Sequence, residues 1–272
     1  MLKARVLTVL LLLPLFLAAL FLIPKTGWAL LMLGVVLIGA VEWSKISAFS
    51  GFQRGVYVSL TLFIGLALLS ESSRSANFML YGMAFLFWAL LAPLWLRNQW
   101  RTRQGLLMAL TGWVLLIPTW LALVELRILG PGLLLGLLAV VWIADTAAYF
   151  AGRKFGRHKL APAISPGKTW EGVAGAFLGV TLYGLAWGMW DNSSAPFNSG
   201  LWRGLLLLWL LTLFSILGDL FESWMKRVAG LKDSGRILPG HGGVLDRIDA
   251  LTAAMPVAAF GLLLLKNNNV IG

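Results

Sequence analysis

The sequence predicts an all-α integral membrane protein with about nine transmembrane helices. Two observations lead to this fold class. The chain of 272 residues is 59% hydrophobic, and its mean hydropathy is +0.84. Apolar runs of roughly 17–25 residues, each long enough to cross a hydrocarbon core about 30 Å thick, recur along the whole chain. Charged residues make up only 12% of the chain, and many of them gather in one polar segment near the C-terminus.

The predicted spans can be placed in order along the chain. They lie near residues 5–23, 27–44, 55–70, 76–96, 105–124, 131–151, 170–190, 202–219 and 250–266. Polar residues interrupt the second and third spans, namely Glu42, Lys45, Gln53 and Arg54. The first run has a basic head, but it lacks a small-x-small cleavage site followed by a polar domain. We therefore interpret it as a retained helix and not as a signal peptide.

The basic residues predict the orientation of the chain in the membrane. The formal net charge is +11, from 22 Lys and Arg residues against 11 Asp and Glu residues. With nine spans, most of the 22 fall on the side of the N-terminus, and the exceptions are Lys25, Arg74, Arg127, Arg203 and Lys266. The positive-inside rule then places the N-terminus and the polar segment 219–249 in the cytoplasm. The charge thus indicates topology and attraction to anionic lipid headgroups, and it does not require a nucleic-acid partner.

The two halves of the chain differ in composition. Residues 1–130 are spans joined by short loops, and we interpret them as a transmembrane scaffold. Their Trp residues are interpreted as interfacial anchors, namely Trp28, Trp43, Trp88, Trp95, Trp100 and Trp113. Residues 131–272 carry the polar segments and are predicted to form a catalytic region that opens to the cytoplasm. Cys is absent, which excludes disulfides, thiolate metal sites and a cysteine nucleophile.

Asp145 is a carboxylate inside the sixth predicted span. Such a group costs at least ~2.5 kcal/mol if it faces lipid, so we expect it to face a polar cavity or a partner. A structural hydrogen bond between helices is the alternative. The basic loop 153–159 that follows this span is interpreted as a topology determinant.

The segment Ser165-Pro166-Gly167-Lys168-Thr169 is predicted to open the seventh span, with Ser165 as the N-cap and Pro166 as the first helical residue. It is not a P-loop, because the GxxxxGK[ST] spacing fails and no strand is predicted before it. Lys168 is then one turn into the helix, where free backbone N–H groups and the helix dipole favour an anion. An ordinary snorkelling lysine is the alternative.

The eighth span is predicted to continue as a helix to about residue 228. Asp219, Ser223, Lys226 and Arg227 recur there at helical spacing, so we expect them to line one face. A carboxylate, a hydroxyl and two cations on one stripe suit a metal-bound phosphate. The alternative is a solvated amphipathic stripe with internal ion pairs.

Glycines and carboxylates complete the polar segment. The glycines among residues 235–243 allow positive φ and close approach to a phosphate. His241 lies among them, with a phosphate contact, an orienting role or a structural role as alternatives and a metal-ligand role as a less favoured one. Asp246 and Asp249 are three residues apart at the start of the ninth span, on one helix face. Opposed to Asp219, they predict an all-oxygen site that suits Mg²⁺ better than zinc.

The polar segment also carries a family resemblance. It reads Ser223-x-Met225-Lys226-Arg227-x4-Lys232-Asp233-x-Gly235-x2-Leu238-Pro239-x-His241-Gly242-Gly243-Val244-x-Asp246-Arg247-Ile248-Asp249. This pattern resembles the signature of the phosphatidate cytidylyltransferases, or CDP-diacylglycerol synthases. The Asp145 segment and the stretch from Ser165 to Gly172 look like upstream elements of the same family. The resemblance in motifs covers roughly residues 142–250, and residues 1–130 resemble the family only in hydropathy.

The resemblance implies an activity and a set of partners. Members of this family transfer CMP from CTP to phosphatidate, giving CDP-diacylglycerol and pyrophosphate, and they require Mg²⁺. In bacteria they are polytopic inner-membrane proteins. We therefore expect CTP, phosphatidate and membrane lipids as partners, and Mg²⁺ as cofactor with a second cation as an option. A homodimer is a further option.

The expected site residues fall into three groups. Those expected to serve catalysis are Lys226, Arg227, Lys168, Asp145 and His241. Those expected to bind substrate are Ser223, Ser165, Lys232, Gly242, Gly243 and Arg247. Those expected to bind Mg²⁺ are Asp219 and Asp246, with Asp249 assisting.

Two rival functions are compatible with intramembrane carboxylates. A transporter could use Asp145 and Asp219 on a proton or cation path, but the chain shows no internal repeat and no paired broken helices. Another lipid-phosphate enzyme, such as a CTP-dependent lipid kinase or a polyprenyl-phosphate transferase, is the second rival. The order of Lys-Arg, His-Gly-Gly and Asp-Arg-x-Asp argues against it.

Overall fold

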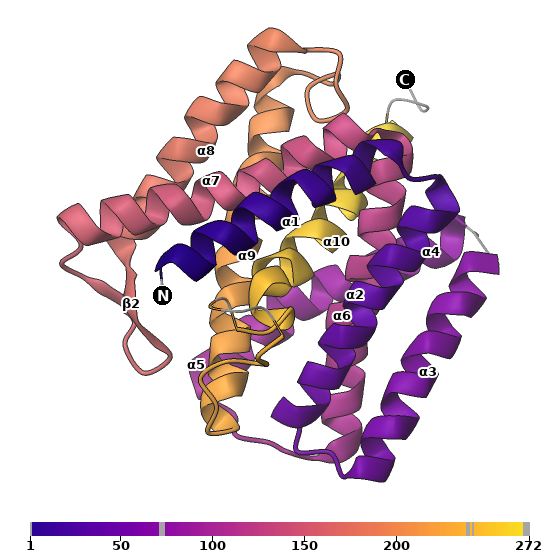
Figure 1. The fold of residues 1–272 in the computed structure, drawn as a ribbon. Coiled ribbons are helices and arrows are strands. Elements are labelled where there is room, and N and C mark those ends of the chain that lie inside the picture. The colour runs from indigo at the N-terminus through magenta and orange to yellow at the C-terminus, as the bar shows by residue number, and fades with distance from the viewer. Residues whose placement is uncertain (1, 71–73, 238–239, 241, 269–272) are drawn as a thin grey trace.

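The protein is built almost entirely of helices (Figure 1). The computed structural model describes residues 2–70, 74–237, 240 and 242–268. Its helices are α1 (Leu2–Leu22), α2 (Lys25–Ile46), α3 (Gly51–Ser70), α4 (Arg74–Leu86), a π-helical turn (Phe87–Leu91), α5 (Ala92–Asn98), α6 (Gly105–Leu129), α7 (Pro131–Phe155), α8 (Trp170–Trp190), α9 (Leu201–Val228) and α10 (Leu245–Asn268). Two short strands, β1 (Lys159–Ala161) and β2 (Ser165–Thr169), pair antiparallel.

Most of these helices can cross a membrane. Among the described residues, eight helical segments are long and apolar enough, and the apolar part of α1, Leu10–Leu22, is shorter. The π-helical turn joins α4 and α5 into one of the eight, Ala76–Asn98. The predicted fold class, an all-α polytopic membrane protein, is confirmed.

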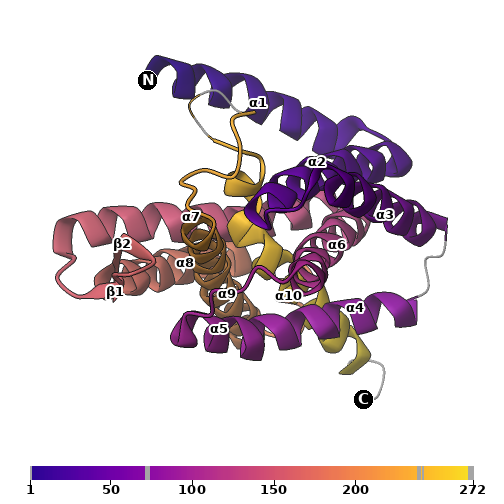
Figure 2. The ribbon, with the colours of Figure 1, turned by 90° about the horizontal axis from the view of Figure 1, so that it is seen from below.

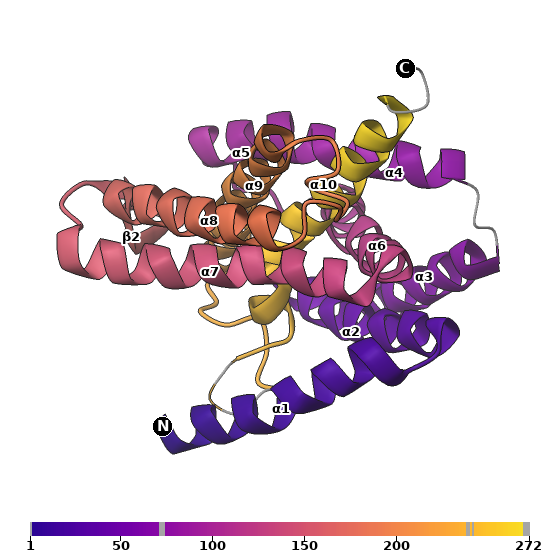
Figure 3. The same ribbon diagram turned by 90° about the horizontal axis from the view of Figure 1, so that it is seen from above.

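The helices form a central layer, two flanks and a projecting arm. α6, α9 and α10 lie in the centre, and α10 packs on both α6 and α9. α1, α2 and α3 flank this layer on one side, and α4 and α5 flank it on the other (Figures 2 and 3). α7 and α8 run side by side as the arm, which contacts α9. Residues of α7, α8 and α9 can therefore face one common space.

Small residues bring α7 and α8 close together. A Cβ atom on Gly175 would lie 2.3 Å from the Cβ of Ala151, and one on Gly179 would lie 2.8 Å from the Cβ of Ala147. Helix pairs in lipid associate by van der Waals packing, which favours small residues at the contact. The close contact holds α7, which carries Asp145, firmly against α8.

Several Trp residues are buried inside the helix bundle. Trp28, Trp43 and Trp88 are at most 1% exposed, and the indole N–H groups of Trp28 and Trp43 donate to backbone carbonyls of α6, at Leu123 (3.1 Å) and Met108 (2.8 Å). Their interpretation as interfacial anchors is therefore wrong. A buried indole N–H needs an acceptor, and carbonyls of the neighbouring helix supply it.

The start of the seventh predicted span differs from the expectation. Residues 165–169 form strand β2, which pairs with β1, and helix α8 begins only at Trp170. The N-cap is Thr169, whose Oγ1 accepts the N–H of Gly172 at 3.1 Å. Ser165 is thus not the cap, and Lys168 lies in the strand and not inside the helix. A β-hairpin between α7 and α8 satisfies the backbone here, so the expectation that no strand precedes this segment is also wrong.

Regions 1–130 and 131–272 pack directly on each other. Helix α6 contacts α2 on one side and α10 on the other, so it joins the two regions. The division into scaffold and catalytic region stays a prediction.

Candidate active site

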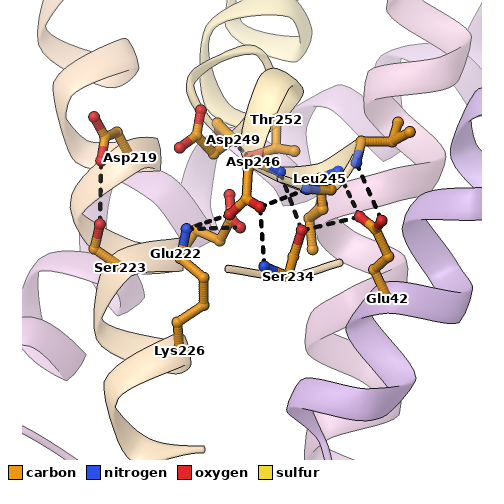
Figure 4. Close-up of polar contacts among 12 residues, drawn as sticks. Glu42, Asp219, Glu222, Ser223, Lys226, Ser234, Leu245, Asp246, Asp249 and Thr252 are labelled. Carbon is orange, nitrogen blue, oxygen red and sulfur yellow. Dashed lines mark hydrogen bonds and ion pairs between the residues drawn. The ribbon is translucent and has the colours of Figure 1, made fainter. Parts of the chain in front are cut away.

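Lys226 lies in a buried ionic cluster (Figure 4). As predicted, α9 continues to Val228, and this places Lys226 opposite the start of α10. Its Nζ lies 2.6 Å from Oδ1 of Asp246 and 3.2 Å from Oε1 of Glu222. Lys226 is 9% exposed and Glu222 is 2% exposed. A buried cation between two carboxylates is costly to separate from them, so its ammonium group is held in one place.

Asp246 is held from both sides. Its Oδ2 accepts the backbone N–H of Ser234 at 2.9 Å and that of Gly243 at 2.8 Å, while its Oδ1 contacts Lys226. Hydrogen bonds to an ionised acceptor are stronger than neutral ones. Asp246 therefore joins the loop before α10 to the inner face of α9.

A second ion pair joins the hairpin to α9. The Nζ of Lys168, on β2, lies 2.7 Å from Oδ2 of Asp219, and the hydroxyl of Ser223 donates to Oδ1 of Asp219 at 3.2 Å. Both partners of the ion pair are partly exposed, with 25% of the Lys168 side chain and 31% of the Asp219 side chain accessible. This pair is therefore open to a ligand, in contrast to the buried pair at Lys226.

The exposed pair faces a cavity of about 540 Å³ between α7, the hairpin, α8 and α9. Its lining residues are Asp145, Ala148, Tyr149, Gly152, Arg153, Leu160, Ser165, Gly167, Lys168, Thr169, Gly172, Val173, Ile216 and Asp219. The predicted site residues Asp145, Ser165, Lys168 and Asp219 therefore share one cavity. Asp246 is not among the lining residues of this cavity.

Electrostatic interactions connect the cavity with the buried cluster. Asp145 interacts with Asp219, Lys168 and Arg247. Asp249 interacts with Asp219 and Lys168 and also with Lys226. Charges from α7, β2, α9 and α10 thus form one continuous network. Such a network can bind an anionic substrate and a cation together, because it offers both signs of charge within a short range.

Glu42, in α2, holds the loop before α10. It is fully buried, and it accepts the backbone N–H groups of Val244 (3.1 Å) and Leu245 (2.7 Å) and the hydroxyl of Ser234 (3.0 Å). In the sequence, Glu42 was identified only as an interruption of a predicted span. A carboxylate in an apolar run was the available signal, because such a group needs partners inside the protein.

The family of this chain follows from comparison with known proteins. Residues 3–265 match the cytidylyltransferase family. This chain belongs to the cytidylyltransferase family. A protein of Pseudomonas aeruginosa named phosphatidate cytidylyltransferase is 40% identical over 270 residues, which cover 95% of this chain and 96% of the relative. Proteins with the same name from Haemophilus influenzae and Brucella suis are 33% and 37% identical; the matches cover 96% and 84% of this chain, and 98% and 81% of the relatives.

This cytidylyltransferase is therefore a CTP-using nucleotidyltransferase. The structure does not bring all its predicted site residues together. Arg227, Lys232 and Arg247 are exposed, although Arg247 interacts with Asp145. His241 lies outside the described residues. The roles predicted for these four residues stay predictions.

The glycines of the cytidylyltransferase signature have contacts within the protein itself. Gly242 has a φ of +83°, and the N–H of Gly243 is donated to Asp246. A Cβ atom on Gly243 would lie 2.2 Å from Oγ of Ser234 and 2.5 Å from both carboxylate oxygens of Glu42. These glycines thus allow two carboxylates to approach the backbone, and their predicted contact with substrate stays a prediction.

The donor set of the enzyme fits a hard cation in chemical type. Asp219 and Asp249 interact with each other, and Asp219 is open to the cavity. Among the described residues, no three acidic or histidine side chains are already gathered as a metal site. Mg²⁺ is commonly held by one or two carboxylates together with substrate phosphates, so this pair of carboxylates fits such a cation in number and type.

Two further residues of the enzyme site were missed from the sequence. Arg153 lines the cavity, although the basic loop that contains it was interpreted as a topology determinant. Glu222 is buried against Lys226 and was given no role from the sequence. The spacing of Glu222 and Lys226, four apart on a helix, was the available signal for an ion pair.

Proposed function

We propose that this enzyme transfers CMP from CTP to phosphatidate and releases pyrophosphate, with CDP-diacylglycerol as the lipid product. The names of the relatives support phosphatidate as the acceptor. The observation that carries the proposal is the cavity that Asp145, Lys168 and Asp219 line, because it offers cations and carboxylates at the membrane-spanning helices α7 and α9. A lipid phosphate and a nucleotide can meet at such a place.

The reaction needs no nucleophile from the protein. A phosphate monoester has a second pKa of about 6, so phosphatidate is mostly doubly ionised at neutral pH. One of its phosphate oxygens attacks the α-phosphorus of CTP, and the bond from that phosphorus to the oxygen of the β-phosphate breaks. The bonding pair leaves with pyrophosphate. The enzyme must align the two anions in line and balance their charge.

Lys168 and Lys226 are the cations that we assign to this task. Lys168 is open to the cavity and can exchange its contact with Asp219 for a phosphate oxygen. Lys226 is fixed by Asp246 and Glu222, and we assign it to the charge of the leaving pyrophosphate. A cation that is fixed before substrate arrives costs little reorganisation during the reaction.

We further propose that Mg²⁺ binds at Asp219 and Asp249. Asp246 was the other principal ligand expected from the sequence, but Lys226 and two backbone N–H groups already engage its carboxylate. We therefore assign Asp246 first to holding the loop and Lys226. When bound, Mg²⁺ supplies positive charge that neutralises phosphate oxygens and orients them.

Access to the site follows from the two substrates. CTP is soluble and phosphatidate stays in the bilayer, so the cavity must open to water and sideways to lipid. Apolar Leu160, Val173 and Ile216 line it together with the polar groups, which suits a lipid beside a nucleotide. We propose a bacterial inner-membrane location with the N-terminus and the site in the cytoplasm. A homodimer and a second cation stay predictions.

The test is an assay with purified protein, phosphatidate, Mg²⁺ and CTP labelled at the α-phosphate. We expect the label in the lipid fraction and one pyrophosphate for each labelled lipid. Omission of phosphatidate should abolish both products. Pyrophosphate without labelled lipid would indicate a nucleotide hydrolase. If a parallel assay with CTP labelled at the γ-phosphate gave labelled lipid and the α-label did not, the enzyme would be a lipid kinase. Either result would overturn the proposal.

A further inference from the structure

We propose that Glu42 is a positioning residue of the active site, acting from helix α2 in the N-terminal half. The loop between α9 and α10 is called the signature loop below. Glu42 contacts residue 234 and residues 243–245 in and next to this loop, and so fixes Asp246 and Lys226. This inference rests on the proposed function for its kinetic consequences. Its geometric part, the attachment of the loop to α2, can be tested without any assay of activity.

Glu42 caps helix α10 from another helix. The first N–H groups of a helix have no partner within it, and a negative charge there is favourable. Oε1 of Glu42 accepts the N–H of Val244, and Oε2 accepts the N–H of Leu245, the first residue of α10. This contact joins residues about 200 positions apart in the sequence, and Glu42 is 0% exposed. A side chain of the preceding loop usually caps a helix, whereas the cap of α10 is a carboxylate from another helix.

Ser234 binds both Glu42 and Asp246 (Figure 4). The hydroxyl of Ser234 donates to Glu42, and its backbone N–H donates to Asp246. The N–H of Asp246 in turn donates to Oγ of Ser234 at 3.3 Å. Gly243, next to Val244, gives its N–H to Asp246. The path runs from Glu42 through the loop to Asp246 and then to Lys226.

The chain closes tightly around the Glu42 carboxylate. A Cβ atom on Gly235 would lie 2.1 Å from its Oε1, and one on Gly243 would lie 2.5 Å from each oxygen. A side chain at either glycine would therefore overlap the Glu42 carboxylate. A neutral amide in its place would present an N–H group to backbone N–H donors, which is unfavourable.

The variant Glu42→Gln tests the proposal, because it keeps the size of the side chain. We expect kcat for CDP-lipid formation to fall by roughly 10–100-fold, since displacement of a catalytic group by about 1 Å has an effect of that order. The KM for phosphatidate should change less, because Lys168 and Asp219 lie on other elements. Glu42→Asp should recover part of kcat by restoring the charge.

Hydrogen exchange separates a local effect on the loop from a general loss of stability. In Glu42→Gln we expect faster exchange at residues 242–246, while α6, α7 and α8 keep the exchange rates of the unchanged protein. The matched control is Glu125→Gln. Glu125 is also a carboxylate in the N-terminal half, and it accepts hydrogen bonds from Asn77 and from Tyr81 (2.8 Å), away from the signature loop. Its exchange at 242–246 and its kcat should match those of the unchanged protein.

The outcomes separate the two proposals. If the unchanged protein makes no CDP-lipid, the proposed function fails, and the exchange result still decides whether Glu42 holds the loop. If the unchanged protein is active and Glu42→Gln keeps its kcat, or loses it together with protection along the whole chain, the positioning role is wrong. Should Glu42→Gln fail to fold, Ser234→Ala replaces it. This change removes the two contacts of the hydroxyl, to Glu42 and to the N–H of Asp246, and it keeps the contacts of Glu42 with Val244 and Leu245. It should produce a smaller loss of kcat with the same local exchange.

Discussion

At the scale of single residues, the site combines one exposed ion pair with one buried ion pair. Lys168 and Asp219 face the cavity, whereas Lys226 is enclosed with Asp246 and Glu222. An exposed pair can open to admit a ligand at small cost, because water and the ligand replace the lost contact. Loss of one partner from a buried pair leaves an unpaired charge and is costly. Substitutions at the two lysines should therefore differ in their effect on stability.

Lys226→Met should abolish turnover and also destabilise the protein by about 3–5 kcal/mol, because Glu222 and Asp246 lose their cation. Lys168→Met should abolish turnover with little loss of stability. Thermal unfolding and the radiolabel assay, done on the same samples, check both predictions.

The double variant Lys226→Met/Glu222→Gln should recover stability without activity. The control is Lys45→Met, at an exposed lysine of α2; if it also loses activity, only general electrostatics is at work.

The three carboxylates should differ in their dependence on Mg²⁺. Asp219→Asn and Asp249→Asn should lower kcat roughly 10²-fold and raise the Mg²⁺ concentration that gives half-maximal rate. Asp246→Asn should lower kcat with a smaller shift in that concentration, because its main contacts are to Lys226 and the loop. Titration of activity with Mg²⁺ measures this. The assignment fails if Asp246→Asn shifts the concentration more than Asp219→Asn does.

Arg153 offers a further test at the cavity. It lines the cavity wall with Tyr149, and its Nη1 lies 3.1 Å from the Tyr149 hydroxyl. We expect Arg153→Met to raise the KM for phosphatidate or CTP about 10-fold, since a charge-assisted contact contributes roughly 1.5–3 kcal/mol. Lys154→Met is the neighbouring control, because Lys154 lies over the ring of Phe155 instead. Equal KM values in the two variants would exclude a substrate contact at Arg153.

At the scale of elements, the arm of α7 and α8 determines the shape of the cavity. The close contact between α7 and α8 depends on small residues, and the hairpin that carries Lys168 lies at the end of this arm. The hairpin contains only two short strands, so it depends on its neighbours for support. Its ends are tied to α8, because Glu171 accepts the backbone N–H of His158 at 3.2 Å. A change in the spacing of α7 and α8 should therefore reach the site.

Gly175→Ala should destabilise the protein by roughly 1–3 kcal/mol and lower activity, because the added methyl group overlaps Ala151. Gly132→Ala is the matched control within α7, where an added Cβ meets nothing within 4 Å. It should be neutral or stabilise by up to about 1 kcal/mol. Thermal unfolding in detergent measures both variants. Equal stability of the two would show that the helices are not in close contact there.

At the scale of the whole molecule, the parts of the site come from both halves of the chain. Glu42 comes from α2, Asp145 from α7, Lys168 from the hairpin, and Lys226 and Asp246 from α9 and α10. These parts meet because α10 packs on α6 and α9 while α2 packs on α6. In the proposed orientation, these cationic groups are on the cytoplasmic side. The N-terminal half therefore contributes to the site as well as to the bundle.

The sidedness of the site can be measured with single cysteines, since the chain has none of its own. Ile237 is 52% exposed in the signature loop. We expect Ile237→Cys to react with a membrane-impermeant thiol reagent only from the cytoplasmic side, and CTP with Mg²⁺ to slow the reaction. Leu129→Cys is the control. Leu129 is 57% exposed at the C-terminal end of α6, which the predicted topology places outside, so this cysteine should react from outside. Labelling of Ile237→Cys from outside intact cells would overturn the proposed orientation.

The sequence by itself determined the fold class, the family and most of the charged residues proposed for the site. Long apolar runs have few solutions in a bilayer, so the helices could be placed to within a few residues, and the continuation of α9 to Val228 followed from its spacing. The signature between Ser223 and Asp249 identified the family because it fixes many positions. These properties are local, and they depend on hydropathy, spacing and residue type.

Only the tertiary structure decided which charges meet. Lys168 pairs with Asp219, and Lys226 pairs with Asp246, although the sequence had assigned Asp246 to the metal. Glu42 reaches the loop across about 200 positions, and Trp43 lies inside the bundle. Helical periodicity tells which face a side chain occupies but not which helix that face meets. A buried charge or indole N–H must find its partner wherever the packing of the bundle brings one within reach.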